Sequence, residues 1–262
     1  MTSQACELAG RDRGETPVAC PEGCAAGAAL KTQCYACQLR ALCSPCGSAH
    51  ADWRLSGDLI CDRKTMLSGE TLHLQGDRFQ FLHAVRSGSF KSCLALSDGR
   101  DQVCGFHSAG DVIGLDSVDS GRHETSVIAL EDTQACAIAY APLMKAAPGL
   151  LPLQHTLTQL MGREIMRGLG RMMLLGNMSA RERIASFLLD MSRRSAARGA
   201  SATEFNLSMT RAEIGSYLGM TLETVSRSLA AFMQECLIDV SNRRIRITNL
   251  DAFVREFEPI RH

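Results

Sequence analysis

Residues 210–233 read TRAEIGSYLGMTLETVSRSLAAFM, which is the pattern of two short helices joined by a tight turn. Thr210 and Glu213 form a capping box at the start of the first helix, and Gly219 is placed to end it. Thr221 is placed to cap the second helix. These signals follow one another at the spacing of a helix-turn-helix, and we predict that motif here.

The second helix of this motif divides into an apolar face and a polar face. The apolar residues at helical spacing are Val225, Leu229 and Phe232. The polar residues at its N-terminal end are Thr221, Glu223, Ser226 and Arg227. In a helix-turn-helix, this end of the second helix enters the major groove, where Arg can bond guanine O6 and N7 and Glu can accept from cytosine N4. We therefore expect the four polar residues to contact double-stranded DNA. The alternative is an ordinary helical hairpin with a polar face.

Charge is unevenly distributed along the 262 residues. The chain has 28 Lys and Arg against 28 Asp and Glu, and a net charge of zero argues against nucleic-acid binding. Residues 1–160, however, hold 13 basic and 17 acidic residues, whereas residues 161–262 hold 15 basic and 11 acidic residues. All the basic residues of the second part are arginines, which suit bidentate contacts to phosphate and guanine. The asymmetry indicates an acidic sensing part and a basic contacting part.

The segment 179–262 contains more than the helix-turn-helix. Ser179 and Glu182 predict a capping box that opens a helix through Met191. A linker rich in Ser, Ala, Arg and Gly is expected over 192–202. The stretch CLIDVSNRRIRITNL (236–250) predicts a β-hairpin that turns at Ser241-Asn242, and a hairpin in this place strengthens the DNA-binding interpretation.

The segment 151–178 is predicted to be one long helix, with its clearest pattern over 153–175. Residues alternate at spacings of three and four along one side: Thr158, Met161, Ile165, Gly168, Met172 and Leu175. Such a heptad seam needs a partner, either the core of the chain itself or the same helix of a second subunit. Because arginines 163, 167 and 171 lie on other faces, the pattern favours a two-fold homodimer.

The segment 51–150 reads as short strands separated by glycine turns. The clearest are FQFLHAVRSG (79–88), FKSCLALSDG (90–99), RDQVCGFHSAG (100–110) and HETSVIALED (123–132). Turn signals recur about every ten residues, as in an antiparallel sandwich or roll. Ser97-Asp98-Gly99 fits a tight hairpin turn between two of these strands.

Residues 1–50 hold seven of the twelve cysteines and show little periodicity, so this segment needs a ligand or the rest of the protein to order it. Cys34, Cys37 and Cys43 have the spacing C-x2-C-x5-C, and Cys46 adds a second C-x2-C. Two metal sites are compatible with this spacing. Zinc pairs are usually separated by a longer loop, whereas an iron–sulfur cluster accepts close cysteines and one remote ligand. Spacing alone slightly favours the cluster.

The isolated cysteines of the later segments have no such grouping. We expect them to be small buried apolar residues: Cys61, Cys93, Cys104 and Cys236.

Other classes of protein are disfavoured. The chain has no apolar run of eighteen residues and no secretory signal, so we expect no membrane segment and a cytoplasmic location. A redox enzyme is the alternative class for a cysteine-rich chain. The sequence, however, has no Gly-rich nucleotide loop, no Ser/His/Asp pattern and no paired carboxylates, and we expect no enzyme activity.

Taken together, C-x2-C-x5-C before a β-roll, a long helix and LGMTLETVSR (218–227) resemble the FNR-type oxygen-sensing transcription regulators of the CRP/FNR family. FHSAGDVIGLDSVDSGRH (106–123) and MSRRSAARG (191–199) add to the likeness, which covers roughly residues 30–250. The resemblance implies an α+β fold. It would contain an N-terminal β-roll sensor domain like that of cyclic-nucleotide-binding proteins, a dimerisation helix and a C-terminal winged helix-turn-helix.

The same resemblance implies the cofactor and the partners. One [4Fe-4S] cluster per subunit would be held by Cys34, Cys37, Cys43 and, in DTQACAIAY, Cys136. The cluster-loaded homodimer would bind palindromic sites of the type TTGAT…ATCAA, control anaerobic gene expression and contact RNA polymerase. The hairpin around Ser97–Asp101 is a candidate surface for that contact.

Two related sensors are less compatible with the sequence. Cyclic-nucleotide-binding members of the family place an Arg before a Ser to hold the phosphate, and the matching pair here is Thr125-Ser126. Haem binding would need a histidine, and nothing in the sequence groups His73, His83 and His107.

Overall fold

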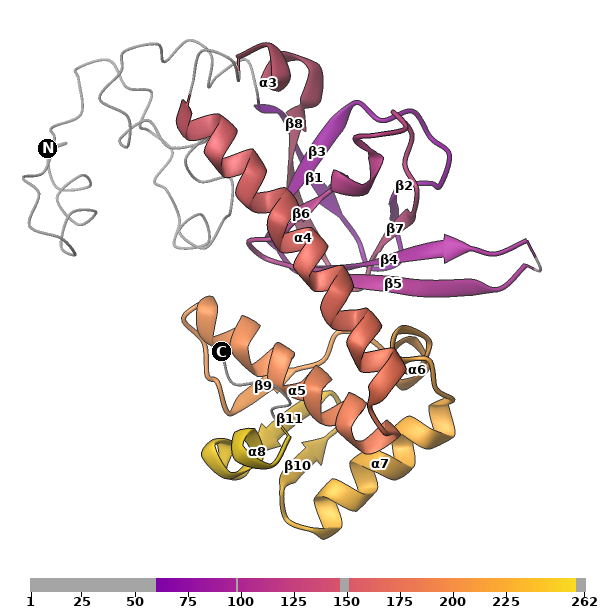
Figure 1. The fold of residues 1–262 in the computed structure, drawn as a ribbon, viewed down its shortest axis with the longest axis vertical. Coiled ribbons are helices and arrows are strands. Elements are labelled where there is room, and N and C mark those ends of the chain that lie inside the picture. The colour runs from indigo at the N-terminus through magenta and orange to yellow at the C-terminus, as the bar shows by residue number, and fades with distance from the viewer. Residues whose placement is uncertain (1–59, 98, 147–150, 258–262) are drawn as a thin grey trace, which may run out of the picture.

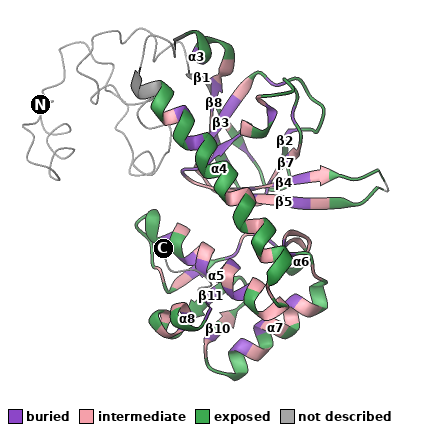
Figure 2. Ribbon diagram, in the orientation of Figure 1, coloured by how far each residue is buried: buried purple, intermediate pink, exposed green. Residues whose placement is uncertain are grey.

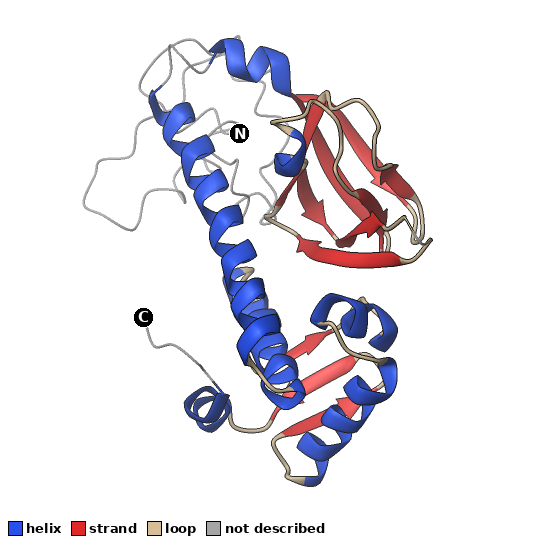
Figure 3. Cartoon of the chain, turned by 45° about the vertical axis from the view of Figure 1, so that its right-hand side comes forward, coloured by secondary structure: helices blue, strands red, loops and turns tan. Residues whose placement is uncertain are grey.

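The computed structural model describes residues 60–97, 99–146 and 151–257. A group of strands, one long helix and a mixed helical and strand domain follow one another along the chain (Figure 1). Figure 3 shows the long helix extending from the strand-rich unit to the C-terminal domain. The predicted α+β class, with strands first and a helix-turn-helix last, is confirmed.

Eight strands build the first unit as two antiparallel sheets. They are β1 (Ile60–Met66), β2 (Thr71–His73), β3 (Phe81–Ser87), β4 (Ser89–Ala95), β5 (Asp101–Ser108), β6 (Val112–Ile113), β7 (Ser126–Ala129) and β8 (Thr133–Ala139). The sheet orders are β1-β8-β3-β6 and β2-β7-β4-β5. Buried side chains from both sheets, among them Val85, Phe90 and Val127, form a common core, as expected for a roll.

Two glycine turns at the ends of β4 show why the chain reverses there. Gly88 has a φ of +75°, and a Cβ on it would lie 2.6 Å from Thr133 Cγ2, so no other residue fits between β3 and β4. Gly99 has a φ of +82°, and its N–H donates to the carbonyl of Leu96 at 2.9 Å. The turn predicted between the strands of 90–99 and 100–110 is therefore present.

The predicted long helix is α4 (Leu151–Asn177), and the short α3 (Tyr140–Ala146) precedes it. Near its N-terminal end, Leu157 and Leu160 are buried in a cluster with Leu82 and Ile138 of the roll. Most of the remaining length of α4 is exposed (Figure 2). One side of the helix thus completes the sensor core, and the other is left uncovered by the described residues of the chain.

The helix opened by Ser179 is α5 (Ala180–Ala197), with the predicted capping box to Glu182. The linker expected over 192–202 is wrong for residues 192–197, which continue this helix. Ser192 and Ser195 are buried there, and Ser192 Oγ donates to the carbonyl of Ala202 at 2.5 Å. These tertiary contacts outweigh the weak helix propensity of serine.

The C-terminal domain places the predicted helical pair on a small sheet. Its further elements are β9 (Glu204–Asn206), α6 (Arg211–Leu218), α7 (Leu222–Gln234), β10 (Ile238–Ser241), β11 (Arg244–Ile247) and α8 (Leu250–Phe257). The predicted hairpin is β10–β11, and β9 extends it in the order β10-β11-β9. Ser241 pairs with Arg244, so the turn of this hairpin is Asn242-Arg243, one residue later than expected. Asn242 has a φ of +55°. Neither β9 nor α8 was predicted from the sequence.

None of the described helices combines the length and the apolar composition that crossing a lipid bilayer requires.

Candidate nucleic-acid interface

The two helices of the 210–233 stretch are fixed by their caps. Thr210 Oγ1 accepts the N–H of Glu213 at 3.2 Å, and Glu213 Oε2 accepts the N–H of Thr210 at 2.6 Å. Gly219 ends α6 with a φ of +63°, and Thr221 Oγ1 accepts the N–H of Thr224 at the start of α7. These local bonds set where α7 begins, as the sequence predicted.

Gly215 allows α7 to approach α6 closely. A Cβ at this position would lie 2.6 Å from the carbonyl oxygen of Met220, in the turn between the two helices. Any larger residue would therefore push the turn outward. The angle between α6 and α7 depends on this glycine as well as on the caps.

The apolar and polar faces of α7 lie as predicted. Val225, Leu229 and Phe232 are all buried, at 4% exposure or less. Thr221, Glu223 and Arg227 are exposed, and Ser226 is half-buried. The structure thus brings the four predicted DNA-contacting residues together on the open side of the first two turns of α7.

These side chains already have local partners, and those of Ser226 and Glu223 bear on their chemistry. Arg211, at the first position of α6, donates from Nη1 to Ser226 Oγ at 3.3 Å. A bond from its own backbone N–H, followed by one from the Thr221 hydroxyl, lowers the pKa of exposed Glu223. Glu223 is therefore an ionised acceptor at neutral pH. The sequence prediction missed Arg211, although its place directly after the cap Thr210 could have indicated it.

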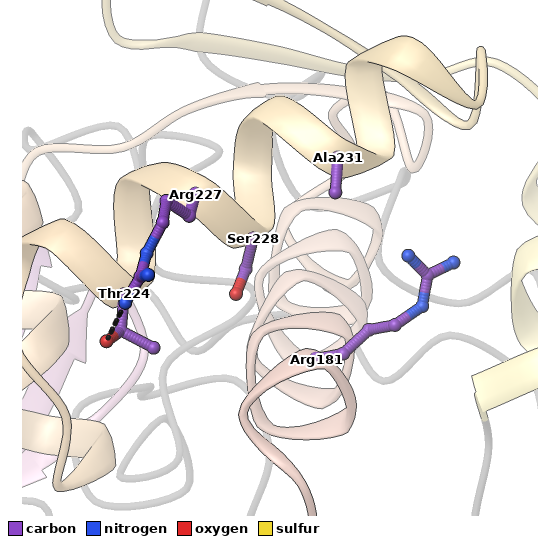
Figure 4. A pocket seen from close by; sticks show the side chains of 5 residues that line it. All are labelled: Arg181, Thr224, Arg227, Ser228 and Ala231. Carbon is purple, nitrogen blue, oxygen red and sulfur yellow. Dashed lines mark hydrogen bonds between the residues drawn. The ribbon is translucent and has the colours of Figure 1, made fainter.

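A shallow groove between α5 and α7 borders this face, lined by Arg181, Thr224, Arg227, Ser228 and Ala231 (Figure 4). In Figure 4, Arg227 lies along α7 beside Thr224, and the dashed line joins them at 3.5 Å. Arg181 extends the other way from α5 and forms ion pairs with Glu235 and Glu256. Its guanidinium also stacks 4.6 Å from the Phe232 ring centroid, so Arg181 joins α5 to α7.

These features together define a class of protein. A capped helix pair presents polar and arginine side chains on an open face, a small hairpin follows it, and a roll with a long helix precedes it. This combination is that of a DNA-binding regulator with a separate sensor domain.

Comparisons with known proteins place the chain within that class. The family descriptions "Crp-like helix-turn-helix domain" and "Cyclic nucleotide-binding domain" match residues 182–256 and 63–147. The transcriptional regulatory protein Btr of Bordetella pertussis is 39% identical over 217 residues, 83% of this chain and 90% of that protein. The fumarate and nitrate reduction regulatory protein of Escherichia coli K12 is 36% identical over 222 residues, 85% of this chain and 89% of that protein.

Among solved structures, FixK2 from Bradyrhizobium japonicum has a TM-score of 0.70 and 32% identity, and the match covers 78% of this chain and all of that one. The chain belongs to the CRP/FNR family of DNA-binding transcription regulators.

The expected cluster ligands are only partly within the described residues. Cys34, Cys37 and Cys43 lie outside them. Cys136 lies in β8, where it pairs across the sheet with Arg63 of β1 and Ala84 of β3, and its side chain is half-buried. It packs against the cluster that contains Leu157 and Leu160 of α4. A thiol in a partly apolar environment next to the surface fits the donor that a soft iron centre requires.

The residues that match the cyclic-nucleotide phosphate site have other partners. Thr125 Oγ1 donates to Asp116 Oδ2 at 2.9 Å, and Ser126 Oγ accepts the N–H of Gln75 at 2.9 Å. Neither side chain carries a positive charge that would balance a phosphate. The match to the cyclic nucleotide-binding domain thus describes the fold of the roll, and the absence of a nucleotide ligand stays a prediction.

The structure groups histidines that the sequence left apart. The His73 ring stacks on His123 at 3.5 Å between centroids, and the His83 ring lies 6.2 Å from His73. All three are buried, and both ring nitrogens of His73 and of His83 lack a hydrogen-bond partner among the residues that the structure describes. Within the part of the chain that the structure describes, however, no three His, Cys, Asp or Glu side chains are placed to hold a metal ion.

The isolated cysteines only partly match their expected role as small buried residues. Cys93 is buried and Cys104 is half-buried, but Cys236 is exposed. Cys236 follows α7 with a φ of +57°, and this turn leaves its side chain in solvent. The side chain of Cys61 lies outside the described part of the structure.

Proposed function

We propose that this chain is a cytoplasmic regulator that senses oxygen and controls anaerobic gene expression as a homodimer on palindromic DNA of the TTGAT…ATCAA type. The observation that carries the DNA-binding part is the open polar face of α7, anchored by a fully buried apolar face. Its proposed base-contacting residues are Thr221, Glu223, Ser226 and Arg227.

The proposed sensor is a [4Fe-4S] cluster held by four thiolates. Its ligands would be Cys34, Cys37, Cys43 and Cys136. The bound cluster would supply an oxygen-reactive centre. The fumarate and nitrate reduction regulators at 36–37% identity support this assignment, as does the position of Cys136.

The position of Cys136 suggests how the sensor would influence dimerisation. Its side chain packs on the same cluster as Leu157 and Leu160, which are on the first turns of α4. A change in what Cys136 holds would therefore act on the helix that carries the predicted dimer seam. This is a shift between two populations that differ in dimerisation.

The predicted seam supports the homodimer. Met161, Ile165, Met172 and Leu175 are between 38% and 70% exposed, so the core formed by the described residues does not cover them. Thr158 is exposed, and a Cβ added to Gly168 would meet no neighbouring atom within 4 Å. Of the two partners that the sequence left open, a second copy is the one this exposure favours.

RNA polymerase is the proposed partner for activation. The hairpin that joins β4 and β5 extends from the roll, and Leu96 and Asp101 near its tip are exposed (Figure 1). This exposure is compatible with a contact to a second protein beside the bound DNA.

The test is anaerobic reconstitution of the full chain with iron and sulfide, followed by visible absorption, iron analysis and binding to the palindrome. We expect the wild type to hold a coloured iron–sulfur centre and to lose both colour and DNA affinity in air. Cys136→Ala should lose both under anaerobic conditions, and Cys236→Ala, at an exposed cysteine, should keep both. A colourless protein with stoichiometric zinc that still binds the palindrome would contradict the cluster and leave a zinc-containing or cluster-independent regulator.

A further inference from the structure

One buried carboxylate lies where the roll, the long helix and the DNA-binding domain meet. Asp111 follows β5, and its side chain is only 7% exposed. Its Oδ2 accepts the N–H of Ser108 at 2.9 Å, which fixes the carboxylate on the tight turn between β5 and β6. The orientation of Asp111 is therefore set by the sensor domain.

Two arginines from different helices bind this carboxylate, one on each oxygen. Arg167 of α4 donates from Nη2 to Oδ1 at 2.6 Å, and Arg194 of α5 donates from Nη1 to Oδ2 at 2.9 Å. Both bonds are charge-assisted, and the site is largely shielded from water. Asp111 thus joins the helix of the predicted dimer seam to the first helix of the DNA-binding domain.

The charges at this junction balance one another. Burial by itself raises the pKa of Asp111, but Arg194 and Arg167 more than offset it, so its pKa is lowered and the group stays ionised. Arg194 donates further to the carbonyl of Phe106 at 3.1 Å and to Asp190 at 2.8 Å. Removing Asp111 would leave Arg194 with weaker and more exposed partners.

A second set of contacts joins the roll directly to α6 of the helix-turn-helix. The backbone N–H of Val103 on edge strand β5 donates to Ser216 Oγ of α6 at 2.9 Å. Lys91 of β4 forms an ion pair with Glu213, the capping residue of α6, at 2.6 Å. The Phe106 ring lies 5.1 Å from the Tyr217 ring. The roll therefore holds α5 through Asp111 and α6 through the β4–β5 hairpin.

We infer that Asp111 is a positioning residue for DNA binding, which joins Arg167 to Arg194 and thereby sets the direction in which each subunit presents α7. The inference rests on the proposed function as a DNA-binding dimer. Two recognition helices must meet half-sites that lie one helical turn apart, at about 34 Å. A small rotation between α4 and α5 moves each α7 away from its groove, although the base-contacting side chains themselves are unchanged.

The readout that separates positioning from general stability is the preferred spacing between half-sites. The wild-type full chain and Asp111→Asn are compared, both anaerobically reconstituted, on palindromes whose spacer is unchanged or altered by one base pair, and on a single half-site. We expect the wild type to bind the unchanged spacer at least tenfold more tightly than the altered ones. Asp111→Asn should lose most of this preference, keep its half-site affinity, and remain a dimer by sedimentation.

The chain offers matched controls on the same arginines. Asp190→Asn removes an exposed partner of Arg194, and Glu164→Gln removes an exposed partner of Arg167 at 3.3 Å. Both leave the bridge through Asp111 in place. Each should keep the wild-type spacing preference.

A second variant covers the case in which Asp111→Asn does not fold. Arg194→Gln leaves buried Asp111 paired with Arg167, and the other carboxylate that it releases, Asp190, is 47% exposed. It should lose the spacing preference to a similar extent. The double variant should lose little more than either single one, because both remove the same link.

The measurements distinguish a positioning role of Asp111 from a general structural role and from failure of the proposed function. A folded, dimeric Asp111→Asn or Arg194→Gln protein with the wild-type spacing preference would overturn the inference. Equal loss on the half-site and on the palindrome would show a general structural role and would also overturn it. A wild type that does not prefer the palindrome to unrelated DNA would instead contradict the proposed function.

Discussion

Arg227 and Glu223, two of the proposed base-contacting residues, differ in the hydrogen bonds that they could form with DNA bases. Both are exposed on α7, and neither takes part in the core below it. Arg offers a planar pair of donors, whereas Glu offers acceptors only. A guanine and a cytosine within one half-site are therefore the bases that these side chains can distinguish best.

Replacing Arg227 by Ala should weaken binding to the palindrome by about 1–3 kcal/mol per half-site and relax the preference at one base pair, because a bidentate contact is lost. Competition binding with a set of single-base variants measures both effects. Arg255→Ala, which removes one exposed arginine from α8, is the control for net charge. An equal loss of affinity on all sequences would show that Arg227 contacts only phosphate.

The buried histidines of the roll should make the stability of the protein depend on pH. Burial is the largest cause that lowers the pKa of His73 and of His83 from 6.5 to about 3, and the nearby His123 and Lys64 act in the same direction. Asp77 faces His73 and opposes the shift there. Near pH 6.5, histidines in the unfolded chain begin to bind protons, whereas both of these rings stay neutral in the folded protein.

The roll should therefore lose stability as the pH falls from about 6.5 towards 3, because the unfolded state binds protons that the folded state rejects. Between pH 7 and pH 5 the loss is about 1–2 kcal/mol per histidine. Urea unfolding at the two pH values measures it. His83→Leu should show a smaller dependence on pH than the wild type, and His155→Gln, at an exposed position of α4, should show the same dependence. Equal pH dependence in His83→Leu would contradict the assignment.

At the scale of an element, α4 has two different sides. Leu157 and Leu160 are at most 6% exposed, because the roll covers them. The exposed apolar stripe is wider than the predicted seam, since Met166, Leu169 and Met173 are between 45% and 62% exposed. A contiguous apolar stripe of this kind is typical of a helix that pairs with another helix.

A charge placed in this stripe should prevent pairing and leave the monomer folded. Met172 is 70% exposed, so Met172→Glu removes little buried surface from the described part of the chain but would bring two like charges together across a two-fold axis. We expect the dimer dissociation constant to rise more than tenfold in analytical ultracentrifugation. Gln159→Glu adds the same charge at an exposed position outside the seam and should have little effect. A dimer of undiminished strength in Met172→Glu would place the interface elsewhere.

At the scale of the whole molecule, the sensor and the DNA-binding domain share one hydrophobic core. Cys93, Val103 and Phe106 of the β4–β5 hairpin are buried in the same cluster as Ile214 and Leu218 of α6. The hairpin is thus part of two domains, and its edge strand β5 is covered by α6 instead of being left open. The roll therefore contacts the helix-turn-helix directly as well as through α4.

The accuracy of the sequence prediction depended on the range of the interactions involved. Capping boxes at Ser179 and Thr210 involve residues three apart, and both were placed correctly. The strand β9 has only three residues, too few for an alternating pattern to be detected. The extension of α5 beyond Met191 depends on burial of serines against other elements, which no local rule could indicate.

In the candidate site too, the features set by local interactions were predicted and those set by distant contacts were not. The open face of α7 followed from helical periodicity, and the structure agrees. Cys136 could not be selected from the other cysteines by spacing, because its place beside β3 results from the pairing of strands distant in sequence. Arg211 beside Ser226 depends on how α6 crosses α7 and was not predicted.

The sequence by itself determined the capped starts of α5, α6 and α7, the end of α6 at Gly219, the apolar periodicity of α4, the strand-rich character of 51–150 and the polar face of α7. All of these come from interactions between residues a few positions apart. Tertiary structure alone decided which side of α4 the roll covers. It also decided that Asp111 lies between Arg167 and Arg194, which are 56 and 83 residues away. Contacts at such separations exist only once the chain is folded, because the free energy of burial, and not any local pattern, selects them.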